Sequence, residues 1–492
     1  MISPYCAMKF LLPFIKPRLF SLLFTTVGVC LPFLRVQAQT QEQVPDTINL
    51  LYNWHDPSLP ATLAYANVYN DVWGMAINGR EYAILGSTMG THIFDITTAG
   101  TEQEVAFIEG AYTGNGVIHR DYADYRGFLY IVCDEGYGIS TLQIVDMRTL
   151  PEAPVVVYDS NELLTMAHTV VIDTLHARLY ACAPTNINGT RKSLQLFDIH
   201  EPANPQFLKN VFLPDWVHDC YVQNDTAYLN TSDAGLYILY FGDPQNPITL
   251  GSLTDYPGAG YNHSCWITTD GDYLVFADEN HGEPLKIADI SDFSDIEVVA
   301  TCQSGIAPNS IAHNPVIKGN YLYASYYHDG LQIFDLTDPL NPQKISEYKT
   351  YLPTDHDSYR GAWGVYPFLP SGKVLVADMQ YGLFVFDVGM SPANPPTSTP
   401  PTPLPTNGQN TSNIHYRIDQ NSLHISTIRQ ENLIAAQLYD LTGQLVWQQN
   451  NIAQQATNAL NIPLSELKTK QSLLVVRLQT NSGTYTQKIS LF

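Results

Sequence analysis

A five-residue pattern recurs seven times along most of this chain. The clearest copy is Leu331–Asp335, which reads Leu-Gln-Ile-Phe-Asp and follows Asp329-Gly330. Its alternation of apolar and polar residues predicts a half-buried β-strand. Successive copies begin about 42 to 52 residues apart, a period that leaves room for four short strands in each repeat. The copies are Thr91–Asp95, Leu142–Asp146, Leu194–Asp198, Leu236–Tyr240 (without the final Asp), Leu285–Asp289, Leu331–Asp335 and Leu383–Asp387.

The repeat between Trp216 and Thr254 shows how four strands fit into one period. Its two prolines, Pro244 and Pro247, fall between predicted strands, where a missing N–H costs no hydrogen bond of a sheet. The predicted strands are residues 217–222, residues 226–231, a third that begins at Leu236, and residues 248–253.

Seven separate four-stranded sheets could not bury both of their faces, whereas radial packing lets each sheet cover the next. We therefore predict an all-β fold, with a seven-bladed β-propeller over residues 39–390. A linear solenoid is the alternative. It would need distinct polar caps, which the sequence does not show.

The last repeat lacks a fourth strand, because the chain runs from Leu383–Asp387 straight into the Pro-rich residues 391–396. In contrast, residues 48–54 precede the first repeat and belong to no repeat of their own. We expect this N-terminal segment to pair with Leu383–Asp387 and to complete the last sheet.

The N-terminus carries the pattern of a targeting segment. Lys9, Lys16 and Arg18 precede an apolar run over residues 19–34, and Val36-Gln37-Ala38 has the small residues of a cleavage site. We interpret residues 1–38 as a secretory signal peptide. A retained membrane anchor is the alternative, but the run is short for a spanning helix and contains a proline. The sequence thus predicts export, either to the cell surface or into the medium.

Composition narrows the function classes. The chain has 24 Lys and Arg against 47 Asp and Glu, a net charge of −23, which argues against nucleic-acid binding, because phosphate binding needs clustered Lys and Arg. Five cysteines remain after the predicted signal peptide, and an odd number scattered over the repeats argues against a disulfide framework. We expect buried free thiols.

The C-terminal fifth of the chain lacks the repeat. Residues 391–413 are rich in Pro and Thr, which favours an extended linker. Residues 414–492 contain alternating apolar segments and the hairpin signals 440–443 and 481–483, which predict a small all-β sandwich of immunoglobulin-like size.

The repeats resemble a known family. The Leu-x-Ile-Val/Phe-Asp strand with its Asp-Pro-x-Asn-Pro turn is similar to the LVIVD repeat. Together with Trp73-Gly74 and the His-containing first strands, it resembles the choice-of-anchor B family of bacterial surface proteins over residues 47–390. This resemblance implies an exported propeller whose anchor varies, and it implies no established reaction.

Residues 414–492 resemble the sorting domain of the type IX secretion system of Bacteroidetes. The resemblance rests on Leu438–Val446, on Ile462–Leu467 and on Thr486–Ile489, although the usual Gly-x-Tyr and the final basic residue are absent. It implies that the type IX secretion machinery is a partner of this segment and exports the protein across the outer membrane.

One constellation in the repeats carries candidate chemistry. A His stands at the same place of the first strand in five repeats, and Trp73 and Trp363 fill that place in the other two. First strands line the channel of a propeller, and the loops between second and third strands open at the same end. Those loops also carry Glu135, Glu279 and Asp329. The candidate ligand or metal residues at this mouth are His119, His168, His218, His263, His313, Asp134, Asp233, Asp278 and Asp378.

Imidazoles and carboxylates at one mouth suit either a divalent metal or a polar ligand. The alternative is structural: each imidazole hydrogen-bonds the backbone between sheets. No catalytic motif occurs, so we expect a non-catalytic binding protein for an unknown surface polymer, peptide or glycan. A metal-dependent hydrolase or lyase and a purely structural surface component are the other function classes. No cofactor is indicated beyond a possible divalent metal.

Overall fold

The computed structural model describes residues 48–389, except 357, and separate strands of the C-terminal region. The predicted signal peptide and the predicted linker therefore lie outside the described residues. The chain divides into two compact units, Met1–Asn394 and Pro395–Phe492. The described residues contain strands and no α-helix, which confirms the all-β prediction. Accordingly, no helix in the described ranges is long and apolar enough to cross a membrane.

The first unit consists of four-stranded antiparallel sheets. The first four sheets, in hydrogen-bonded order, are β2(Tyr69–Ile77)-β3(Arg80–Ser87)-β4(Gly90–Asp95)-β5(Gln103–Glu109), β6(Arg120–Tyr125)-β7(Phe128–Cys133)-β8(Leu142–Asp146)-β9(Val155–Ser160), β10(Thr169–Asp173)-β11(Arg178–Cys182)-β12(Leu194–Asp198)-β13(Gln206–Val211) and β14(Asp219–Gln223)-β15(Thr226–Asn230)-β16(Leu236–Tyr240)-β17(Ile248–Leu253). The other three are β18(Asn262–Ile267)-β19(Tyr273–Asp278)-β20(Leu285–Asp289)-β21(Glu297–Cys302), β22(Pro315–Lys318)-β23(Tyr321–Ser325)-β24(Leu331–Asp335)-β25(Gln343–Tyr348) and β26(Ala362–Tyr366)-β27(Val374–Asp378)-β28(Gly382–Asp387)-β1(Asn49–Trp54).

The recurring pentapeptide forms the third strand of each sheet, for example β24. The prediction that this strand is half-buried is wrong, because Gln332, at a polar position of β24, is fully buried. The amide of Gln332 donates to the carbonyl of Asp329 at 2.9 Å. Neighbouring sheets cover both faces of the strand. Its polar side chain therefore forms a hydrogen bond inside the core and does not face solvent.

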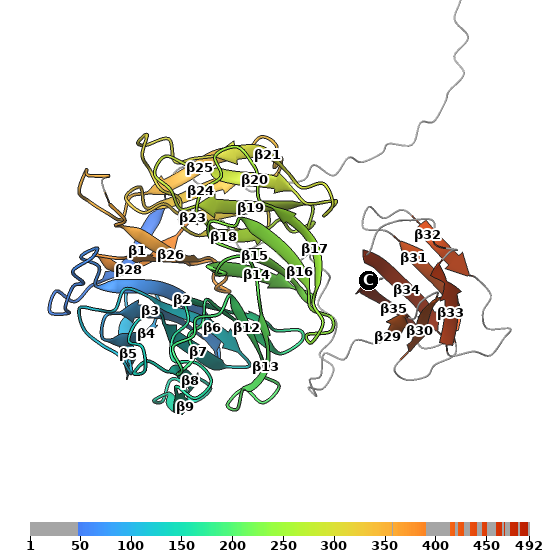
Figure 1. Ribbon diagram of the computed structural model, residues 1–492, viewed down its shortest axis with the longest axis horizontal. Coiled ribbons are helices and arrows are strands. Elements are labelled where there is room, and N and C mark those ends of the chain that lie inside the picture. Colours follow the sequence, from blue (N-terminus) through green and yellow to red (C-terminus); the bar gives the residue numbers. More distant parts are fainter. Residues whose placement is uncertain are drawn as a thin grey trace, which may run out of the picture. The chain divides into compact units, whose positions relative to one another are not determined.

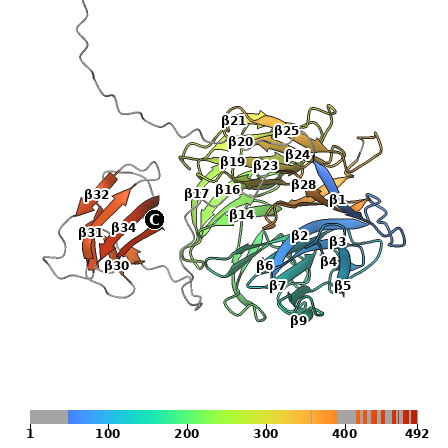
Figure 2. The same ribbon diagram turned by 180° about the vertical axis from the view of Figure 1, so that it is seen from behind.

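The first strands of neighbouring sheets pack against one another in a closed circle. Contacts run from β2 to β6, β10, β14, β18, β22 and β26, and β26 contacts β2 again. In Figure 1 the first strands β6, β14, β18 and β26 lie toward the centre of the unit, and in Figures 1 and 2 strands such as β5, β9, β17 and β25 lie at its edge. The unit is therefore propeller-like: hydrophobic clusters fill the spaces between adjacent sheets.

The circle is closed by the two ends of the unit. β1 pairs antiparallel with β28, and the register places Asn49 opposite Asp387 and Trp54 opposite Leu383. This confirms the expectation that residues 48–54 complete the last sheet. The Trp54 ring packs on Phe94 of the neighbouring sheet, with centroids 4.8 Å apart.

The five cysteines of this unit are buried free thiols, as expected: Cys133, Cys182, Cys220, Cys265 and Cys302. Most of the strands predicted for the repeat after Trp216 are also confirmed, since β15, β16 and β17 occupy the predicted places. The first strand, β14, begins two residues later than predicted.

The second unit contains two sheets that share one hydrophobic core, to which Leu423, Leu438, Ile462 and Val476 contribute. The sheets are β29(Ile414–Ile418)-β30(Ser422–Thr427)-β33(Ala459–Pro463) and β32(Leu445–Gln449)-β31(Leu433–Tyr439)-β34(Leu473–Thr480)-β35(Gly483–Ser490).

Candidate functional site

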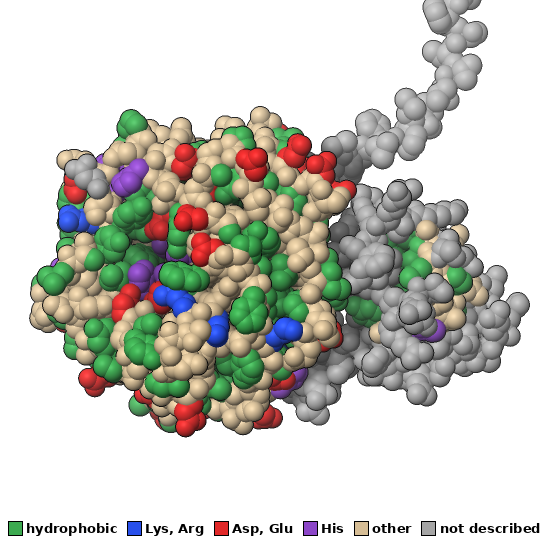
Figure 3. Space-filling view, viewed as in Figure 1, with side chains coloured by type: hydrophobic (Ala, Val, Ile, Leu, Met, Phe, Trp, Pro, Cys, Tyr) green, Lys and Arg blue, Asp and Glu red, His purple; other side chains and the backbone are tan. Residues whose placement is uncertain are grey.

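Five imidazoles and one indole form a closed ring of touching side chains at the centre of the first unit. We call it the histidine ring. Figure 3 shows His side chains within a hollow on one face of this unit. Successive ring centroids lie 4.7 Å (His119–His168), 4.0 Å (His168–His218), 4.1 Å (His218–His263), 4.3 Å (His263–His313), 4.9 Å (His313–Trp363) and 5.1 Å (Trp363–His119) apart.

The repeat explains why these side chains meet. Each His stands within two residues of the start of a first strand: His119 lies one residue before β6, and His263 is the second residue of β18. Because the first strands surround the centre, equivalent residues of successive repeats face the same space. The five His side chains therefore lie together in the described structure, as predicted.

Trp73 does not join the ring, although the sequence pattern placed it there beside Trp363. Its Nε1 instead donates to Oδ1 of Asp124 at 2.9 Å, and its ring packs on Tyr366. Trp73 is the fifth residue of β2, whereas the ring residues all lie within two residues of the start of their first strands. Asn70, the second residue of β2, donates its side-chain amide to the carbonyl of Ile118, the residue before His119.

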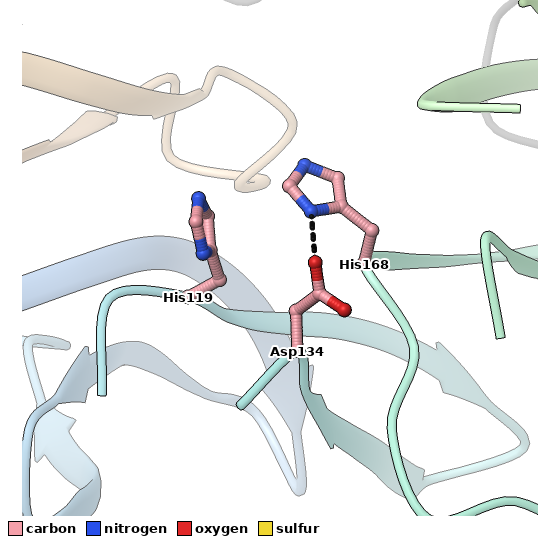
Figure 4. Close-up of side chains that lie close together, drawn as sticks. All are labelled: His119, Asp134 and His168. Atoms are coloured by element: carbon pink, nitrogen blue, oxygen red, sulfur yellow. Dashed lines mark hydrogen bonds and ion pairs between the residues drawn. The ribbon is translucent and has the colours of Figure 1, made fainter. Parts of the chain in front are cut away.

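The ring has two different sides. On one side, Nδ1 of His168 donates to Oδ2 of Asp134 at 2.9 Å, and Nη2 of Arg191 approaches the same oxygen at 3.0 Å. Figure 4 shows His119 beside this pair. Nδ1 of His119 lies 2.6 Å from Oε1 of Glu135. The carboxylate of Asp134 therefore already has a cation, which the next repeat supplies.

On the other side, Glu279 is the acidic group. Its Oε2 lies 3.7 Å from Nε2 of His263, and its Oε1 lies 4.0 Å from Nε2 of His313. The Tyr327 hydroxyl donates to Oε1. Among the described residues no Lys or Arg forms an ion pair with Glu279, so this carboxylate lacks a permanent positive partner.

Burial controls the protonation of the ring. Burial and then the neighbouring imidazoles lower the pKa of His218 and of His263 well below the usual value, and burial lowers the pKa of His313 to about 3. Burial also lowers the pKa of His168, although Asp134 opposes it. For His119 burial also lowers the pKa, but the hydrogen bond to Glu135 and the charges of Glu135, Asp134 and Glu279 together outweigh burial and raise the pKa. Most of the ring is therefore neutral at pH 7, the form in which imidazole binds metals.

The other predicted mouth carboxylates lie apart from the ring. Asp278 is fully buried, and its Oδ2 lies 2.8 Å from Nζ of Lys286 in β20. Asp378 is also fully buried and accepts hydrogen bonds from Thr350 and from the amides of Gln380 and Tyr381. Asp233 is exposed on its loop. The structure thus gives Asp278 and Asp378 structural partners.

Sequence reasoning missed a second layer of acidic groups, one or two residues after the ring positions. The side chains of Asp71 and Asp121 are hydrogen-bonded to each other, and Asp219 contributes to the same electrostatic environment. Gly364 occupies this position in β26, where an added Cβ would overlap the carboxylate of Asp71. The signal was available, since Asp219 directly follows His218 and Asp121 lies two residues after His119.

Three groups of side chains in the described residues have donor atoms within 4.8 Å of one another, as a metal site requires. Two belong to the ring: His119 with Asp134 and His168, and His218 with His263 and Glu279. The third joins Asp173, His176 and Asp225 away from the ring, and there Arg178 already binds Asp225.

One repeat of this chain matches a known protein family. Residues 311–350 match the family model of the LVIVD repeat, which is a β-propeller-type repeat. The matched residues contain His313 and all four strands of the sheet β22 to β25. A comparison with curated proteins finds no match to this chain. One stretch of this chain thus carries an LVIVD repeat, and the four-stranded sheet that it forms recurs around the histidine ring.

Proposed function

We propose that this chain is an exported seven-bladed β-propeller of the choice-of-anchor B kind that binds an extended polypeptide at the mouth around the histidine ring. The LVIVD repeat and the closed circle of first strands support the propeller architecture. The resemblance of residues 1–38 to a signal peptide supports export.

The distribution of exposed apolar side chains carries the binding proposal. In antiparallel sheets the loops between second and third strands and the connections between sheets lie at the same end, which is the end of the histidine ring. Among the exposed large apolar side chains of the described residues, three lie in loops of the opposite end: Leu175, Leu340 and Phe368. Eight lie in the loops of the mouth: Leu63, Tyr137, Ile139, Ile187, Phe212, Trp216, Ile306 and Leu352.

Such a collection on one face is typical of an interaction site, whereas single exposed apolar residues are normal. Most of the eight are aliphatic, which favours a polypeptide with apolar side chains over a glycan, for which aromatic platforms dominate. Trp216 stands out because it is about half exposed while its ring is held by Arg191, whose guanidinium lies 4.4 Å from the ring centroid.

Selection from a displayed peptide library tests this role. The wild-type chain should enrich a family of apolar peptides, and a Trp216→Ala/Ile187→Ala variant should lose that binding. A Leu175→Ala/Leu340→Ala variant, changed at the opposite end, is the matched control and should bind as the wild type does. Selective binding to a glycan array without peptide enrichment would show that the ligand is a glycan and not a polypeptide. Binding to neither would overturn the proposal.

A metal-dependent hydrolase or lyase is the second candidate function, and Glu279 favours it. Burial raises the pKa of Glu279 to about 7, and the group lies beside the imidazoles of the ring. A carboxylate with a pKa near the working pH suits a general base. An activity that requires Glu279 and a divalent metal would support this candidate.

We further propose that residues 414–492 form an immunoglobulin-like sorting domain for type IX secretion. The two sheets with a common core support a sandwich, and the segment 438–446 spans the hairpin of β31 and β32. The secretion machinery would then be the partner of this unit, and the propeller would reach the cell surface or the medium.

A further inference from the structure

The part of the histidine ring next to Glu279 has the donor set of a metal centre. Nε2 of His263 and Oε2 of Glu279 lie 3.7 Å apart, and donor atoms of His218, His263 and Glu279 all lie within 4.8 Å of one another. Two ligands of a tetrahedral Zn²⁺ ion with bond lengths near 2.1 Å are about 3.4 Å apart. Small side-chain adjustments would therefore bring all three atoms to a single ion.

The neighbouring groups orient these side chains as metal sites require. Nδ1 of His218 donates to the carbonyl of His263 at 3.2 Å, and Nδ1 of His313 donates to the carbonyl of Trp363 at 2.6 Å. A proton fixed on Nδ1 leaves Nε2 as a free electron-pair donor. The Tyr327 hydroxyl holds Oε1 of Glu279, which leaves Oε2 directed toward the imidazoles.

The uncompensated charge of Glu279 gives a second indication. The side chain of Glu279 is 16 % exposed, and it lacks a Lys or Arg partner within the described part of the chain. A buried carboxylate without a cation is costly, and a bound divalent ion would offset that cost.

The two other clusters are already neutralised. Arg191 forms an ion pair with Asp134, and Arg178 forms one with Asp225. A cation that entered either group would meet a guanidinium. We therefore propose that His218, His263 and Glu279 bind one borderline divalent ion of the Zn²⁺ or Co²⁺ class, with His313 beside them as a possible fourth ligand.

Nitrogen ligands and a carboxylate select this class of ion over Ca²⁺ and Mg²⁺, which prefer oxygen ligands throughout. The ion would lie at the bottom of the mouth that we propose binds a polypeptide. The test below uses metal alone, so its outcome does not depend on whether the polypeptide proposal holds.

Calorimetric titration of Zn²⁺ into the untagged, chelator-treated full chain tests the site. One equivalent should bind, and Co²⁺ should give a visible absorption spectrum at the same stoichiometry. Glu279→Gln should weaken binding by more than about 100-fold, because it removes the charged ligand while keeping the side-chain shape. Asp134→Asn and His176→Gln, in the other two clusters, are matched controls and should change the affinity by less than about twofold.

X-ray absorption of the Zn²⁺-loaded wild type provides a measurement that needs no variant. It should show two or three imidazoles and an oxygen at about 2.0 to 2.2 Å. An absence of stoichiometric binding, or a spectrum without imidazole, would overturn the proposal. So would binding that survives in a folded Glu279→Gln chain and is lost in Asp134→Asn, because the ion would then lie on the other side of the ring.

Discussion

The side-chain amide of Asn53 donates to the carbonyl of Leu383, 330 residues later in the chain, at 3.0 Å. This hydrogen bond lies between β1 and β28 and joins the two ends of the first unit within one sheet. The N-terminal strand therefore holds the circle of sheets closed, although it contributes no residue to the histidine ring.

Deletion of residues 39–56 should destabilise the first unit severely. The deletion exposes the edge of β28 and uncovers the apolar groups that Trp54 covers, so the melting temperature should fall by roughly 10 °C or more. Differential scanning calorimetry measures the change. Deletion of residues 414–492 is the control and should leave this transition in place. An unchanged transition after the N-terminal deletion would show that β1 does not close the unit.

Replacement of Lys286 should be costly. Lys286 is 1 % exposed, and its Nζ lies 2.8 Å from Oδ2 of the fully buried Asp278 and 2.9 Å from Glu283. Lys286→Met leaves the Asp278 carboxylate buried without a cation and should lower the free energy of unfolding by about 3 to 5 kcal/mol. The double variant Lys286→Met/Asp278→Asn should recover part of that loss in urea denaturation. A small effect of the single variant would mean that water reaches Asp278.

The Asp71–Asp121 pair predicts a decrease in stability as pH rises. Burial raises the pKa of Asp71 from 3.8 to about 6. Burial and then the neighbouring carboxyl raise the pKa of Asp121 well above its usual value. Between about pH 4 and 6 the folded chain therefore binds more protons than the unfolded chain, so the free energy of unfolding falls as pH rises through this range.

Urea denaturation of the metal-free chain at pH 4.5 to 7 measures this slope. Ionisation of Asp71 should lower the free energy of unfolding by about 2 to 3 kcal/mol over this range, because its pKa in the folded chain is raised by roughly two units. Asp71→Asn should lose this part of the slope, because its side chain does not ionise. The exposed Asp233→Asn is the control. Equal slopes in the wild type and in Asp71→Asn would show that Asp71 is not protonated in the folded state.

Removal of residues 414–492 in the native host should stop export at the outer membrane. The first unit has its own core and is a separate compact unit, so it should accumulate in the periplasm in a soluble, folded form. Cell fractionation and protease protection measure the location. A truncated protein that appears outside the cell in normal amount would exclude a sorting role for this segment.

Local pattern was sufficient to place most strands. Leu331–Asp335 is a strand because its apolar-polar-apolar start and its β-branched and aromatic residues, Ile333 and Phe334, favour that conformation between turn signals without reference to distant contacts. The closing partner of Leu383–Asp387 was also predictable, since a repeat without its fourth strand requires one from elsewhere. The burial of Gln332 could not be predicted from the sequence, because it depends on how closely the neighbouring sheet approaches.

The ring could be predicted from the repeat, and its chemistry could not. Equivalent positions in successive repeats place His119, His168, His218, His263 and His313 around one centre in any circular arrangement of the repeats. Trp73 does not join them, because it lies in the middle of β2, four residues after the start of that strand.

The sequence by itself determined the repeats, the four strands of each and the residues that can face the centre, because these follow from backbone preferences and from side-chain periodicity over a few residues. Only the tertiary structure decided which charges are compensated. Arg191 reaches Asp134 from the following sheet, Lys286 neutralises Asp278, and Glu279 is left with imidazoles and a phenol. Electrostatic energy depends on distances of a few ångströms and on the exclusion of water, and both are fixed by packing between sheets that are distant in the chain.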